Sequence, residues 1–167
     1  LVKDFDMKQN ETTAWLPMSS VINETVVDIE YLSHSYAIGG CDLSATTDLT
    51  CATLLIRKPN DENVYVLQHY FIPQAKIDHL ESTKSKEAPY KLWAEQGWLT
   101  INEGAQVDYS KVTEWFSDMV QKFDIRPLWV CYDRALSGYW VPEMESYGFD
   151  MEKTAQGPFT WSQPMKE

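Results

Sequence analysis

The alternation of hydrophobic and polar positions divides the chain into an irregular beginning and a folded remainder. Residues 1–35 are polar around KQNETT and contain one short stretch, near 26–33, that could form a helix. From residue 36 onward, apolar runs and turn residues follow each other without a break in composition. We therefore interpret residues 1–35 as a linker or N-terminal arm and residues 36–167 as one domain.

The first apolar runs of this domain predict three strands. Strands are expected at 36–42 and 51–57, where apolar residues dominate. The turn cluster at 59–63, PNDEN, should fold the next run, 64–72, back as a hairpin. Pro73 should end that third strand, so the domain is expected to begin with an antiparallel meander.

Helices and strands then alternate to the end of the chain. The expected helices follow Pro73, run from about 89 to 97, start after a cap at Asp108 and span 137–147; the expected strands span 98–102, 127–133 and 149–154. The stretch PLWVCYD at 127–133 is apolar enough to predict a strand covered on both faces. This order predicts an α/β domain with a mixed sheet flanked by helices.

Composition limits the function classes. The net charge of −11 argues against nonspecific nucleic-acid binding, because phosphate contacts need Lys and Arg. Bound metal ions would offset part of that charge.

No apolar run is long enough to span a bilayer and no signal peptide is visible, so we expect no membrane partner. The three cysteines lack metal-binding spacing and are expected to be reduced thiols in a cytosolic protein.

Two aspartates stand where strands of the predicted sheet end. Asp42 closes the strand 36–42, which would carry a carboxylate into the interior, and Asp133 closes the strand 127–133. Ligand sites of open α/β sheets lie at the carboxyl ends of strands. Adjacent strands would bring the two carboxylates within a few ångströms, where a hard divalent cation would relieve their repulsion. The alternative is that both residues cap turns, a common role for Asp.

The segment GGCDLSATTDLTCATLLI resembles the G-x-DLS-x-x-x-DLTA segment of tailed-phage terminase large subunits. Further stretches resemble the same family in the same order: MKQNETTAWLPM upstream, then YVLQHYFIPQAKI, APYKLWAEQGWLTINEGAQVDYSKV, VCYDRALS and SQPMKE. The similarity covers nearly the whole chain and matches the C-terminal nuclease of that family, not its ATPase. The chain also lacks the phosphate-binding G-x-x-x-x-G-K-[ST] loop of ATPases.

This resemblance implies an RNase H-like fold and an endonuclease that cuts double-stranded concatemeric DNA. Asp42 and Asp133 would be catalytic and would hold two Mg²⁺ or Mn²⁺ ions. The family's third acidic ligand is expected beyond Glu167, so we expect the C-terminal part of the fold to be missing from this sequence and the activity to be impaired. The implied partners are double-stranded DNA, an N-terminal ATPase domain, the small terminase subunit and the portal. The implied location is the cytoplasm of the bacterial host.

Several neighbouring residues have two interpretations each. Asp48 either supports the metal site or shapes the connection after the first strand, and Ser44 either touches a phosphate or caps that turn. Arg134 either contacts DNA phosphate or pairs with a nearby acid. Gly39 and Gly40 would allow a close approach of backbone or substrate. Two alternative functions stay open: a catalytically incomplete docking module of the packaging motor, and another RNase H-like nuclease of the resolvase or integrase type.

Overall fold

A computed structural model describes residues 18–23, 25–83, 89–155, 157 and 160. The strands are β1 (Ser35–Asp42), β2 (Thr50–Ile56), β3 (Tyr65–Pro73), β4 (Leu99–Asn102), β5 (Ile125–Tyr132) and β6 (Met151–Lys153). The helices are α1 (Met18–Val21), α2 (Ile29–Leu32), α3 (Gln74–Thr83), α4 (Tyr90–Glu95), α5 (Tyr109–Phe123) and α6 (Trp140–Ser146). The strands form one six-stranded mixed sheet in the order β4-β3-β2-β1-β5-β6, which confirms the predicted sheet type.

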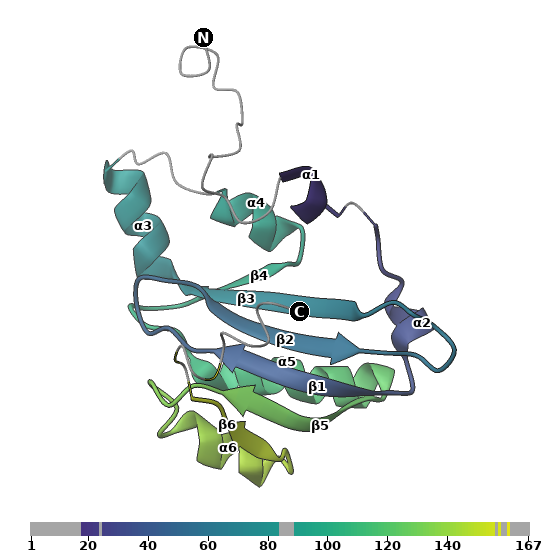
Figure 1. Ribbon diagram of the computed structural model, residues 1–167. Helices are drawn as coiled ribbons and strands as arrows, with labels where there is room; N and C mark the ends of the chain where they lie inside the picture. Colours follow the sequence, from purple (N-terminus) through teal and green to yellow (C-terminus); the bar gives the residue numbers. More distant parts are fainter. Residues whose placement is uncertain (1–17, 24, 84–88, 156, 158–159, 161–167) are drawn as a thin grey trace.

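Strand direction determines where chain segments meet. The pairs β1–β2 and β2–β3 are antiparallel, which confirms the expected meander. The pairs β1–β5, β3–β4 and β5–β6 are parallel. Of the six strands described, β2 alone therefore runs against the others, and Figure 1 shows its arrow opposed to those of β1 and β5. The carboxyl ends of the other five strands lie along one side of the sheet, which we call the carboxyl edge.

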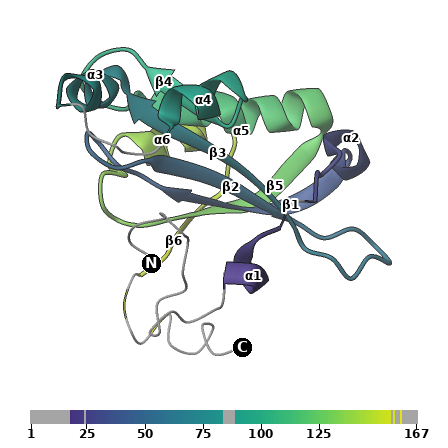
Figure 2. The ribbon, with the colours of Figure 1, turned by 90° about the horizontal axis from the view of Figure 1, so that it is seen from above.

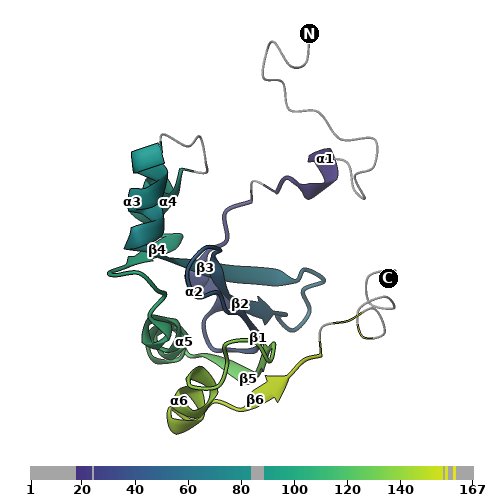
Figure 3. The same cartoon turned by 90° about the vertical axis from the view of Figure 1, so that its left-hand side faces the viewer.

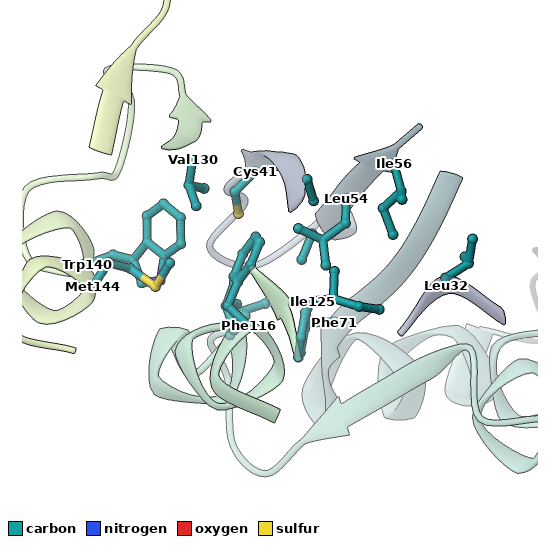
Figure 4. Packing of buried hydrophobic residues seen from close by; sticks show 14 residues of the cluster. Leu32, Cys41, Leu54, Ile56, Phe71, Phe116, Ile125, Val130, Trp140 and Met144 are labelled. Atoms are coloured by element: carbon teal, nitrogen blue, oxygen red, sulfur yellow. The ribbon is translucent and has the colours of Figure 1, made fainter. Parts of the chain in front are cut away.

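The main hydrophobic core lies between one face of the sheet and helices α2, α5 and α6. Helix α5 begins at its cap Asp108, whose side chain accepts a hydrogen bond from the Ser110 N–H. Its residues Val112 and Phe116 are fully buried, as the apolar spacing predicts. From α6, Trp140 and Met144 join the same core, where Figure 4 shows side chains of strands and helices meeting. Pro142 lies in the first turn of α6, where proline is tolerated.

A smaller core lies beside β4, where Ile72 and Leu99 pack with Ile77 of α3. Phe71 and Ile72 are consecutive strand residues and point to opposite faces, so one joins the main core and the other the smaller core. Figure 3 shows α3 and α4 at the β4 end of the sheet and α5 and α6 nearer the β6 end. Helices thus pack against the sheet near both of its edge strands.

On the face of the sheet opposite α5, which we call the open face, no helix of the described residues covers the exposed side chains of β1 and β2. Figure 2 shows α5 and α6 on one side of the sheet and the short α1 on the other. The expectation that 127–133 forms a strand covered on both faces is wrong, because Leu128 and Trp129 are 48% and 39% exposed. Tyr36 and Ile38 of β1 and Leu55 of β2 are also exposed. The apolar run therefore reflects a one-sided strand whose outer face stays apolar.

Candidate functional site

The carboxyl edge places Asp42 and Asp133 on neighbouring strands. In the parallel β1–β5 ladder Cys41 lies opposite Tyr132, so the next residue of each chain segment is one of the two aspartates. Asp42 is the last residue of β1, and Asp133 directly follows β5. Adjacent strands are about 4.8 Å apart, so the two residues extend from the sheet side by side.

Asp42 is solvent-exposed rather than buried, which corrects the expectation drawn from the apolar run around it. Alternation along β1 puts its side chain on the open face with Tyr36 and Ile38, while Ala37 and Cys41 point into the core. Among the described residues its carboxylate has neither a hydrogen bond nor an ion pair. Both of its oxygens are therefore available as ligands, without the cost of a buried charge.

Asp133 combines a turn with a free oxygen. Its Oδ1 accepts a hydrogen bond from the backbone N–H of Ala135, the pattern by which Asp forms a turn through its own side chain. This bond starts the connection that leads from β5 to α6. Since the other carboxylate oxygen has no partner among the described residues, the turn role and a ligand role are compatible.

The connection between β1 and β2, residues 43–49, is held in shape by Ser44 and Thr50. The Ser44 N–H donates to the buried Thr50 hydroxyl at 2.8 Å, and that hydroxyl donates to the Ser44 carbonyl at 3.0 Å. The Asp48 N–H donates to the Ser44 hydroxyl at 3.3 Å. Ser44 thus forms the turn, Asp48 takes part in it through its backbone, and the Asp48 carboxylate is exposed. The sequence pattern did not point to Thr50, because its hydrogen bonds to Ser44 cross the loop between β1 and β2.

A second segment fastens this loop to the main core. The Val107 N–H donates to the Ala45 carbonyl at 2.9 Å, and the Tyr109 hydroxyl donates to the Ser44 carbonyl at 3.3 Å. Val107 and Tyr109 lie at the start of α5. Val112 and Phe116 of this helix are fully buried. The loop beside Asp42 is therefore held by the rigid part of the fold.

Close approach applies to only one of the two glycines. A Cβ on Gly39 would lie 2.8 Å from Val130 Cγ2, whereas a Cβ on Gly40 would meet nothing within 4 Å. Gly39 therefore lets β1 and β5 pack tightly just before the two aspartates.

Within the described residues, His69 has a side-chain partner and Arg134 has none. Arg134 is exposed and pairs with no acid among the described residues, so of its two interpretations the ion pair is not seen there. His69 Nε2 lies 2.8 Å from the Thr100 hydroxyl, and burial lowers the pKa of His69. His69 thus has a hydrogen-bond partner within the sheet.

The carboxylates of Asp42 and Asp133 are the oxygen donors that this site offers to a cation. Within the described ranges, no group of three or more His, Cys, Asp or Glu residues is placed to hold a metal ion. Mg²⁺ is commonly bound through one or two carboxylates, with waters and substrate phosphates completing its shell. The oxygen donors of Asp42 and Asp133 fit a hard divalent cation of this kind.

Some tryptophans of the sheet and its helices are more exposed than their spacing suggested. Trp140 is fully buried, but Trp98 is 61% exposed. With Leu49, Tyr70, Trp93 and Leu99, Trp98 lines an apolar hollow of about 320 Å³. The spacing of Trp93, Trp98, Trp115, Trp129 and Trp140 fits core positions better than a base-stacking surface, but Trp98 and Trp129 are exposed.

Comparisons with known proteins agree on one family. The family model described as "Terminase large subunit, endonuclease domain" matches residues 1–167. The terminase large subunit of Enterobacteria phage HK97 is 36% identical over 96 residues, which are 57% of this chain and 18% of that protein. The crystal structure of the HK97 bacteriophage large terminase matches with a TM-score of 0.61 and 27% identity, over 75% of this chain and 26% of that one.

These matches leave most of both relatives uncovered, since the chain spans about a quarter or less of their length. No helix among the described residues has the length and apolar character needed to cross a membrane. The sheet order and the structural match confirm the α/β RNase H-like fold that the sequence resemblance implied. By the match over its whole length, the chain belongs to the family of terminase large subunit endonuclease domains.

Proposed function

We propose that this domain is a metal-dependent endonuclease that hydrolyses phosphodiester bonds of double-stranded, concatemeric DNA with two Mg²⁺ or Mn²⁺ ions. The observation that supports this most directly is the parallel β1–β5 ladder, which sets Asp42 and Asp133 beside each other at the carboxyl edge. Ligand sites of open α/β sheets occur at this kind of edge. Membership of the endonuclease family agrees with the same activity.

In this proposal the two aspartates have different tasks. Asp42 would hold the ions through both of its oxygens, which no described residue engages, and Asp133 would hold them through the oxygen that its turn leaves free. Bound divalent cations supply polarisation of the phosphate and a more acidic water. The loop 43–49, fixed by Thr50 and by the start of α5, holds the Asp42 side of the site in place.

The remaining assignments concern the whole terminase. We propose that the domain works beside an N-terminal packaging ATPase domain and cooperates with the small terminase subunit and the portal in DNA packaging. The expected place of action is the cytoplasm of the bacterial host. These assignments are supported by the family and by the HK97 relatives.

Cleavage of supercoiled plasmid in Mn²⁺ tests the nuclease proposal. The unmodified chain is compared with Asp42→Asn and Asp133→Asn, which keep side-chain size and remove charge. Asp150→Asn is the matched control, because Asp150 is exposed and lies at the other end of the β5–β6 pair. We expect both site variants to lose cutting by at least ten-fold and the control to keep it. Equal cutting by Asp42→Asn and the control would refute the assignment.

A second candidate function is a docking module of the packaging motor without catalysis. It is favoured by the lack of a third acidic or histidine ligand within the described residues and by the net charge of −11. Calorimetric titration with Mn²⁺ separates the two functions. Binding that disappears in Asp42→Asn supports the nuclease, and no binding at millimolar Mn²⁺ supports the docking module.

A further inference from the structure

Most cations of the described chain are already engaged. Ion pairs join Lys91 to Glu81, Lys111 to Glu114, Lys122 to Asp118 and Arg126 to Asp124. Lys58 donates to the Ser33 carbonyl and the Ser35 hydroxyl, both at 3.1 Å. A phosphate would have to compete with these partners, so such side chains are poor candidates for contacts to DNA.

Three cations have neither an ion pair nor a side-chain hydrogen bond within the described residues: Arg57, Arg134 and Lys153. Arg57 directly follows β2, the strand that runs against the others, so it lies at the side opposite the carboxyl edge. Arg134 directly follows Asp133, and Lys153 is the last residue of β6. Two of the three unengaged cations therefore lie at the edge that carries the acid pair.

Lys153 is held in a defined position there. It lies opposite Tyr132 in the parallel β5–β6 ladder, and Tyr132 lies opposite Cys41 of β1. The Thr154 N–H donates to the Tyr132 carbonyl at 2.8 Å, so the ladder continues past Lys153. Two strand spacings separate the backbone of Lys153 from that of β1, or about 10 Å.

The side chain of Lys153 and that of Asp42 leave the sheet on opposite sides. Met151 packs against the main core, and Lys153, two residues later, shares that side by strand alternation. Asp42 points to the open face. A lysine in this position cannot hold the phosphate that the acids engage, but it can reach the backbone of a duplex lying across the edge.

We infer that Lys153, together with Arg134, contacts DNA phosphates that flank the cleaved bond and so fixes the duplex over the acid pair. This inference rests on the proposed nuclease function. Phosphate contacts position a protein on DNA without reading sequence. A lysine suits this task because its ammonium is a compact charge on a flexible stem. In an acidic domain, a few unengaged cations at the site would determine where the duplex docks.

The salt dependence of DNA binding tests the inference. Anisotropy of a labelled duplex is measured in EDTA, where no cleavage occurs, at several KCl concentrations. Each phosphate contact contributes about 0.9 to the slope of log K against log[salt]. We expect Lys153→Gln to lower the slope by about 0.9 and the affinity about five-fold near 0.15 M salt. Lys153→Arg should keep both values. Lys122→Gln, which removes an exposed cation paired on α5, is the matched control.

Cleavage kinetics provide a second readout. Lys153→Gln should raise the KM for plasmid and leave the rate at saturating DNA unchanged, because the lysine does not touch the acid pair. A slope equal to that of the Lys122→Gln control, or failure of Lys153→Arg to restore it, would overturn the inference. If Lys153→Gln lowers the slope while the chain cuts no DNA, the contact stands and the nuclease proposal fails. If the unmodified chain cuts but its binding has no salt dependence, only the inference about Lys153 fails.

Discussion

Substituting Gly39 by alanine tests how the acid pair is positioned. A Cβ at this position would lie 2.8 Å from Val130 Cγ2, 3.2 Å from Val130 Cβ and 3.3 Å from the Trp129 carbonyl oxygen. Val130 is fully buried and β-branched, so it cannot turn away, and the carbonyl belongs to the backbone of β5. The substitution must therefore push β1 away from β5.

Gly40→Ala is the matched control, because a Cβ there would meet nothing within 4 Å. Both variants gain the backbone term that favours alanine over glycine in a strand, about 0.5–1 kcal/mol. Only Gly39→Ala also has the clash, for which overpacking costs about 1–3 kcal/mol. We expect Gly39→Ala to be less stable than Gly40→Ala by about 1–3 kcal/mol.

Urea unfolding followed by tryptophan fluorescence gives the free energy of unfolding of each variant. A cleavage assay with the same proteins shows whether the displacement reaches Asp42 and Asp133. Equal stability of the two variants would refute the close approach of β1 and β5.

Two further predictions concern stability. Asp61 accepts hydrogen bonds from the Tyr65 hydroxyl at 2.6 Å, the Asn63 N–H at 2.9 Å and the Tyr31 hydroxyl at 2.9 Å, and these bonds lower its pKa to about 2. Since the folded pKa of Asp61 is depressed, its stabilisation of the fold is present at neutral pH and is lost as the pH falls from about 4 towards 2. Melting curves of Asp61→Asn should therefore lose this part of the pH dependence of stability. An unchanged pH profile would contradict the assignment. Thr50→Val removes both hydrogen bonds to Ser44 and should lower the free energy of unfolding by about 1–3 kcal/mol in urea, whereas a neutral effect would show that the 43–49 loop does not depend on them.

Sequence patterns predicted the elements that rest on local chemistry. The PNDEN cluster predicted the hairpin of β2 and β3, and Asp108 predicted the start of α5, because turns and caps depend on neighbouring residues. The apolar runs with Asp42 and Asp133 at their ends predicted two strands that the structure places side by side. That adjacency followed from a general rule for α/β sheets rather than from any local signal.

The patterns failed where the outcome depends on what covers a face. The apolar character of β1 and β5 suggested burial, but Tyr36 and Trp129 are exposed because α5 covers only one side of the sheet. The position of Lys153 at the same edge of the sheet as the acid pair follows from the strand order, which no short stretch of sequence encodes. The roles of Asp42, Asp133, Asp48, Ser44 and Arg134 remain predictions for the experiments above.

Pairing of β1 with β5 also determines at which stage of folding the site forms. Asp42 and Asp133 stand 91 positions apart, and only the closure of that long loop brings them together. Pairing of such distant segments belongs to slow, late steps of folding. A ribosome releases Asp42 well before Asp133, so a nascent or partly unfolded chain holds two separate carboxylates and no site. Under the proposed nuclease function, DNA cutting would therefore begin only after the domain has completed its fold.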